Sequence, residues 1–160
     1  VRYLHLDQID GDVWTVPGEL VKGREGRTED FRVPLCAAAL AVIEAAKPME
    51  RDGFLFPSPR KGVVSDMAMG MHMRRKGLEA RPHGFRTSLR TWLAEATSAP
   101  HEVAETMLGH VTDSGVVRAY RRTDYLDERR RLHEAWADRL TGAGAAVVLP
   151  LARRGAQATD

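Results

Sequence analysis

The stretch HGFRTSLRTWLAEATSAPHEVAETMLGHVTDSGVVRAY, residues 83–120, decides what fold and chemistry the sequence predicts. His83 and Arg86 are three residues apart, so on a helix their side chains project from one face and can converge on one ligand. The tripeptide LGH at 108–110 closes a second short helix, with Gly109 where the backbone must turn. Tyr120 follows ten residues later, inside the basic run RAYRR.

These side chains suit a phosphodiester ligand. Arginine forks onto non-bridging phosphate oxygens, histidines donate hydrogen bonds or move protons, and a phenol can be the nucleophile. Two imidazoles, a guanidinium and a phenol make a poor metal site, and no Asp/Glu cluster with the character of a Mg²⁺ site is visible. We therefore expect no metal and no other cofactor.

Composition bounds the possibilities. The chain has 160 residues, 43% of them hydrophobic, which suffices for one domain with its own core. Arginine supplies 20 of the 24 basic residues. Local basic clusters suit a polyanion, although charged helix faces are usually just solvated; these clusters are Arg74-Arg75, Arg118–Arg122 and Arg129–Arg131. The single cysteine, Cys36, excludes an internal disulfide and fits a reducing cytosol, and no membrane span or signal peptide is visible.

The N-terminal third predicts a small sheet followed by a helix. Residues 6–35 indicate a three-stranded antiparallel sheet with a long second hairpin, and residues 36–47 an alanine-rich helix that Pro48 stops. A loop at 54–62, anchored by Phe54 and Phe56, comes next.

The remainder predicts helices. Ser65-Asp66 can cap a helix over 66–77, whose methionines read as core filler. Pro82 opens the central helix, and the short helix over 101–110 follows it. The last helix is expected over 124–140, with His133 at a surface or an interface. The expected buried positions are Phe85, Leu89, Trp92 and Leu93 on the central helix and Leu126, Leu132, Trp136 and Leu140 on the last.

The order H-x-x-R, L-G-H and a tyrosine ten residues on resembles the catalytic signature of the tyrosine recombinases, the phage-integrase family. The likeness is closest to integrases of prophages and genomic islands and covers nearly the whole chain. It extends to the segments VWTVPGELVKG, FRVPL, FLFPSPR, PHGFR, EVAETMLGH and AYRRTDYLDERRRLHEAWADRL. The resemblance implies an α+β, mainly helical catalytic domain over residues 1–141, with its three-stranded antiparallel sheet packed on a helical bundle. A linker, a strand and a tail are expected over 142–160.

The implied reaction is DNA strand cleavage and rejoining through a 3′-phosphotyrosine. Tyr120 would be the nucleophile, His83 the acceptor of its proton, and Lys22 the general acid for the leaving 5′-oxygen, while Arg86 and His110 would hold the phosphate. Taken alone, His83 and Arg86 would be a capping histidine and a surface arginine. Tyr125 is the rival phenol. Lys22 could instead be an exposed hairpin lysine, with the competing cations Arg24 and Arg27.

The implied partner is double-stranded DNA at attachment sites, bound by a synaptic tetramer in the bacterial cytoplasm and nucleoid. A directionality factor is a further candidate partner. The family's first catalytic arginine would fall just upstream of Val1, and Arg2 lies about five residues too late to replace it, so we expect most of a catalytic domain without its DNA-clamping domain. Two alternatives stay open: a non-catalytic DNA-binding remnant and a topoisomerase-like enzyme.

Overall fold

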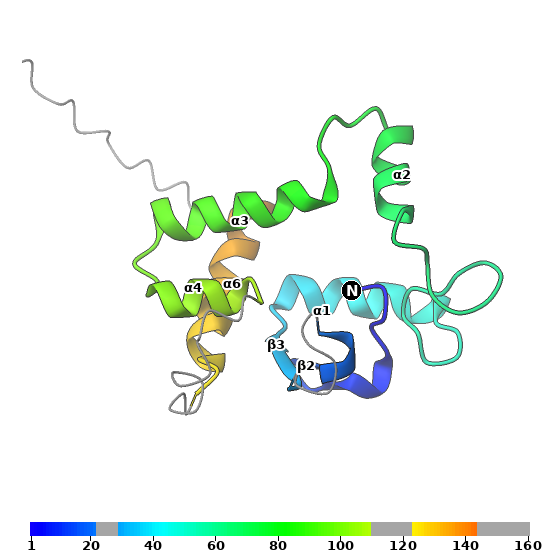
Figure 1. Ribbon diagram of the computed structural model, residues 1–160, viewed down its shortest axis with the longest axis horizontal. Coiled ribbons are helices and arrows are strands. Elements are labelled where there is room, and N and C mark those ends of the chain that lie inside the picture. Colours follow the sequence, from blue (N-terminus) through cyan, green and yellow to red (C-terminus); the bar gives the residue numbers. More distant parts are fainter. Residues whose placement is uncertain (22–28, 110–122, 144–160) are drawn as a thin grey trace, which may run out of the picture.

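The computed structural model describes residues 1–21, 29–109 and 123–143. These residues form the α+β, mainly helical architecture that the sequence predicts, with a small sheet beside α1 and three packed helices next to them (Figure 1). The α-helices are α1 (Ala37–Ala46), α2 (Ala68–Arg75), α3 (Pro82–Ala96), α4 (His101–Met107) and α6 (Leu126–Thr141). Short 3₁₀ turns span Leu6–Gln8, Gly18–Leu20 and Lys47–Met49. None of these described helices is long and apolar enough to cross a membrane.

The predicted three-stranded antiparallel sheet is confirmed, in the order β1-β2-β3. Its strands are β1 (Ile9–Asp10), β2 (Val13–Val16) and β3 (Phe31–Pro34). Gly11, at φ +56°, makes the tight turn from β1 to β2, in a conformation that glycine adopts without steric cost. At the other end of β2, the Gly18 amide donates to Asp30 Oδ1 at 2.9 Å and closes the base of the long hairpin.

One hydrophobic core lies between the sheet and α1. Its buried members are Leu4, Leu35, Ile43, Ala46 and Leu55. Phe56 packs against this core and the Phe54 ring lies 5.1 Å from the His5 ring, as expected of residues that anchor the loop. Both are half-buried, and the fully buried residue is Leu55, which the sequence analysis did not single out. The residue between them faces the core because side chains alternate in an extended segment.

A second core holds α3, α4 and α6 together. It is built on Leu93, Ala104 and Met107, with Leu89, Trp92 and Leu132 packed around them. The Trp92 and Trp136 rings lie 5.1 Å apart and join α3 to α6. Two residues expected in this core are exposed instead, Phe85 at 57% and Leu140 at 66%, because each lies near a helix end that extends past the packed region.

The helix α2 departs from the prediction in two ways. Met67, Met69 and Met71 are exposed and only Met73 is buried, so the reading of all the methionines as core filler was wrong. A two-residue spacing turns about 200° around a helix, so such positions cannot all face one core. Nor does the predicted cap form: Met67 precedes the first helical residue, and no side chain caps the helix.

Candidate active site

His83 and Arg86 lie at the start of α3. Pro82 is the first helical residue, as predicted, and suits that place because its missing N–H would have no partner in the helix. His83 and Arg86 follow three residues apart and are both exposed. The unpaired N–H groups of a first helical turn and the helix dipole favour an anion nearby. The start of α3 therefore offers an imidazole, a guanidinium and a positive helix end on one accessible surface.

The helix α4 runs back along α3 toward this end (Figure 1). The two helices share the second core, and Arg90 Nε pairs with Glu105 Oε1 at 3.0 Å. Beyond Glu105, α4 ends and Gly109 adopts φ +65°, with its amide donating to Thr106 at 2.9 Å. The predicted glycine turn is thus confirmed, and it lies directly before His110 in the sequence.

The other predicted site residues, Lys22, His110 and Tyr120, lie outside the described residues. So do the competing cations Arg24 and Arg27 and the basic cluster Arg118–Arg122. The structure brings His83 and Arg86 together on one helix, and the convergence of all five residues stays a prediction.

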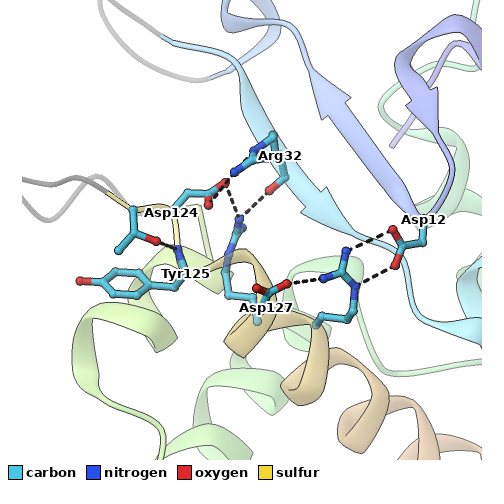
Figure 2. Close-up of polar contacts among 8 residues, drawn as sticks. Asp12, Arg32, Asp124, Tyr125 and Asp127 are labelled. Atoms are coloured by element: carbon cyan, nitrogen blue, oxygen red, sulfur yellow. Dashed lines mark hydrogen bonds and ion pairs between the residues drawn. The ribbon is translucent and has the colours of Figure 1, made fainter.

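The rival phenol, Tyr125, immediately precedes α6. Its backbone has φ +55°, in the left-handed region that residues other than glycine seldom adopt. Its amide donates to Thr123 Oγ1 at 3.1 Å, and its ring points away from the neighbouring charged side chains (Figure 2).

A charged cluster joins the start of α6 to β3, and sequence reasoning missed it. Arg32 donates Nε–H and Nη2–H to the two oxygens of Asp124, each at 2.9 Å (Figure 2). Arg129 Nη2 donates to the Arg32 carbonyl at 2.8 Å and lies 3.4 Å from Asp124 Oδ2. The Arg129 guanidinium also lies 5.1 Å from the centre of the Phe31 ring. We call Arg32, Asp124 and Arg129 the β3–α6 cluster.

Burial explains why pattern reasoning failed here. Arg129 has a side chain only 1% exposed, although arginine is seldom buried unless it is paired. Its partners lie 97 residues away, on β3, and five residues away, at Asp124. The available signal was the acidic Asp124 just ahead of the basic run, but the contact with β3 depends on tertiary packing.

A second ion pair links α6 to the start of β2. Arg130 donates Nε–H and Nη2–H to Asp12 at 2.7 and 3.1 Å, and Nη1–H to Asp127 at 2.7 Å. The hydrogen bonds from Arg130 hold the pKa of the Asp12 carboxyl below its ordinary value. Arg129 and Arg130 are thus occupied within the domain, so the interpretation of Arg129–Arg131 as a cluster for a polyanion was wrong for these two.

His133 is half-buried on α6 rather than at the surface. Burial, assisted by the positive charge of Arg129, lowers the pKa of its imidazole to about 4. The side chain is therefore neutral near pH 7, as expected for a packed residue. Within the described ranges, no three His, Cys, Asp or Glu residues form a group that could hold a metal ion.

The described residues thus combine a small antiparallel sheet and a helical bundle with an exposed histidine and arginine at the start of α3. The model of the phage integrase family matches residues 1–126, and the chain belongs to this family. It is 33% identical over 150 residues to the prophage integrase IntA of Escherichia coli K12, covering 89% of this chain and 35% of that protein.

The integrase of Enterobacteria phage P4 is 30% identical over 158 residues, covering 88% of this chain and 36% of that protein. The integrase of Shigella phage Sf6 is 25% identical over 142 residues, covering 86% of this chain and 37% of that protein. The chain thus spans about a third of the length of these curated relatives. No solved structure matches the chain.

Proposed function

We propose that this chain carries out the catalytic step of site-specific DNA recombination, cleaving and rejoining strands through a 3′-phosphotyrosine. Family membership and relatives named as integrases support it. The observation that carries it is the exposed pair His83 and Arg86 at the start of α3, with α4 returning alongside to the Gly109 turn. That arrangement offers an anion an accessible, positively polarised surface.

In the proposed reaction, the phenol oxygen of Tyr120 attacks the scissile phosphorus and the bond from phosphorus to the 5′-oxygen breaks. A tyrosine of ordinary pKa near 10 must lose its proton on the way, and His83 accepts it. Lys22 gives a proton to the leaving 5′-oxygen. The 5′-hydroxyl of a partner strand then attacks the phosphotyrosine and releases the enzyme. The covalent intermediate conserves the phosphodiester bond energy, so no ATP is consumed.

Arg86 and His110 stabilise the charge that develops on the non-bridging oxygens. A guanidinium can donate two parallel hydrogen bonds to such oxygens, which gives both strength and orientation. Removing one stabiliser of this kind typically lowers the rate roughly 100- to 1,000-fold. With these cations the reaction needs no metal ion.

The proposed substrate is double-stranded DNA carrying attachment sites, brought together by four copies of the protein, with a directionality factor as a further partner. Residues 1–141 form the proposed catalytic domain. The linker, strand and tail expected over 142–160 stay a prediction, since residues 144–160 lie outside the described residues.

The test separates three functions by using two substrates in parallel. One is a pair of attachment-site duplexes with different end labels, and the other is supercoiled plasmid. The full-length protein should join the two duplexes, and Tyr120→Phe should abolish joining while DNA affinity is retained. Relaxation of the plasmid without joining would indicate a topoisomerase-like enzyme. DNA binding with neither activity would indicate a non-catalytic remnant.

A further inference from the structure

The β3–α6 cluster fixes the chain at a place close in sequence to the proposed nucleophile. Asp124 is four residues after Tyr120, and it receives both N–H donors of the Arg32 fork. Paired hydrogen bonds of this kind define orientation as well as distance. The Asp124 carboxylate therefore has one preferred position against the edge of β3.

Arg129 reinforces this attachment from the interior. Among the described strands β3 lies at an edge of the sheet, and Arg129 donates to the carbonyl of Arg32 on this strand. The same guanidinium reaches Asp124 at 3.4 Å. A guanidinium removed from water pays a large desolvation cost, so removing either partner is strongly unfavourable. The cluster thus holds both the Arg32 main chain and the Asp124 side chain.

The backbone next to Asp124 is strained. Tyr125 occupies the left-handed region at φ +55° and leads directly into α6. A conformation of this kind is unfavourable for a residue other than glycine and persists where surrounding contacts over-determine it. The contacts of Asp124 and of the Tyr125 amide supply that constraint.

We propose that Asp124, held by Arg32 and Arg129, is a positioning residue for DNA cleavage. By anchoring the chain four residues after Tyr120, it limits the positions that the Tyr120 side chain can reach. Four residues of fully extended chain span at most about 14 Å, so anchoring Asp124 restricts where the phenol can go. The other end of the cluster is β3, the strand that leaves the hairpin containing Lys22. The cluster thereby links the segments that carry the nucleophile and the general acid. This inference rests on the proposed function.

The chain contains a matched control. The Asp12–Arg130 pair also joins the sheet to α6, with bond lengths of 2.7 and 3.1 Å. Neither of its members is as close to Tyr120 in sequence as Asp124 is, since Arg130 follows Tyr120 by ten residues and Asp124 by four. Both pairs stabilise the contact between the sheet and α6, but the β3–α6 cluster holds Asp124, which is closer to Tyr120 in sequence than either Asp12 or Arg130.

The experiment measures single-turnover cleavage of nicked attachment-site DNA at saturating full-length protein, together with DNA affinity and thermal unfolding. Asp124→Asn should slow formation of the covalent adduct by about 100-fold while DNA affinity is unchanged, because misplacement of a reacting group has an effect of this size. Asp12→Asn should keep the cleavage rate within about 3-fold of wild type, because the Asp12–Arg130 pair does not hold Asp124 and, being partly exposed, adds little to stability. Arg32→Gln leaves Arg129 and Asp124 paired and should also slow cleavage. This variant tests the proposal even if Asp124→Asn does not fold.

A second readout separates positioning from proton donation. On DNA with a 5′-phosphorothiolate leaving group, Lys22→Ala should recover cleavage, whereas Asp124→Asn and Arg32→Gln should stay slow. If the Asp124 and Arg32 variants cleave as fast as Asp12→Asn, or are rescued by the sulfur substrate, the positioning role is overturned and the proposed function stands. If wild-type protein forms no adduct, the proposed function falls and this inference falls with it.

Discussion

At the residue scale, the chain uses arginine in two different environments. Arg86 is exposed at the start of α3, where its guanidinium can meet a ligand, while Arg129 is buried and paired inside the domain. Arginine in water retains its hydration until a ligand replaces it, whereas buried arginine must be satisfied by the protein itself. Substitution of Arg86 should therefore affect ligand binding or catalysis, whereas substitution of Arg129 should affect the stability of the fold.

Arg86→Ala should lower the single-turnover cleavage rate roughly 100- to 1,000-fold, because one stabiliser of the phosphoryl oxygens is lost. Thermal stability should change little, since the side chain is exposed. Arg139→Ala is the matched control, because Arg139 is exposed on the last turn of α6. Equal cleavage by the two variants would remove Arg86 from the site.

Lys22→Ala should block cleavage of ordinary DNA, and a 5′-phosphorothiolate substrate should largely restore it, because a thiolate leaves without receiving a proton. The measurement is adduct formation on the two substrates side by side. Absence of rescue, together with a requirement for Arg24 or Arg27, would transfer the general-acid role to another residue of the hairpin.

His133 predicts a pH dependence of stability. Its folded-state pKa of about 4 lies below its ordinary value of 6.5, so the folded protein disfavours the protonated form. Above pH 6.5 both states are neutral and its contribution is fully present; it is lost as the pH falls from 6.5 toward 4. The total loss is up to roughly 3 kcal/mol. Chemical denaturation of wild type and His133→Gln across this range should show a shallower decline in the variant. Parallel curves would contradict the prediction.

The titration of Asp12 does not overlap the pH range in which His133 affects stability. Hydrogen bonds from Arg130 lower the pKa of the Asp12 carboxyl from its ordinary value of 3.8, so its contribution is lost only as the pH falls below about that value. The His133 window lies above it. The Asp12→Asn variant should therefore keep the decline between pH 6.5 and 4.

At the scale of elements, local rules located most helices and strands but not always the buried face. The sheet, the proline at the start of α3 and the glycine after α4 depend on short-range backbone preferences, and the sequence displayed them. Helix periodicity predicts which face of a helix is apolar. It does not predict how much of that face a neighbouring helix covers. Phe85 illustrates this limit, since it continues the stripe of Leu89 and Leu93 beyond the packed part of α3.

Leu93→Ala and Phe85→Ala should therefore differ in stability. Leu93 is 2% exposed within the second core, so its truncation should cost about 2–5 kcal/mol of unfolding free energy. Phe85 is 57% exposed, and its truncation should cost about 0.5 kcal/mol or less. Urea unfolding of both variants is the measurement, and a comparable loss in the two would show that Phe85 is covered in solution.

At the scale of the whole molecule, α6 connects two hydrophobic cores. One side of this helix contributes Leu132 and Trp136 to the packing against α3 and α4. Another reaches the sheet and α1 through Arg129, through Arg130 and through Glu134, which accepts from the Ala37 amide at 3.1 Å. The helix that follows the proposed nucleophile is therefore attached to both halves of the described structure.

The parts of the candidate site that could be predicted from the sequence are those whose residues belong to short motifs with a fixed spacing. H-x-x-R on a helix and L-G-H at a helix end have local geometric meanings, and the family resemblance supplied the roles. The β3–α6 cluster could not be found in this way, because Arg32 and Asp124 are 92 residues apart. Their pairing follows from how α6 packs on β3, which no local pattern encodes.

The most direct test of the central claim is to identify the tyrosine that becomes attached to DNA. The full-length protein is trapped on nicked attachment-site DNA, digested with nuclease and trypsin, and analysed by mass spectrometry. Trypsin cleaves after arginine, so Tyr120 falls in the peptide Ala119-Tyr120-Arg121 and Tyr125 in the peptide of residues 123–129. We predict a 3′-linked nucleotide on Tyr120. A nucleotide on Tyr125, or none on any tyrosine, would contradict the proposed mechanism.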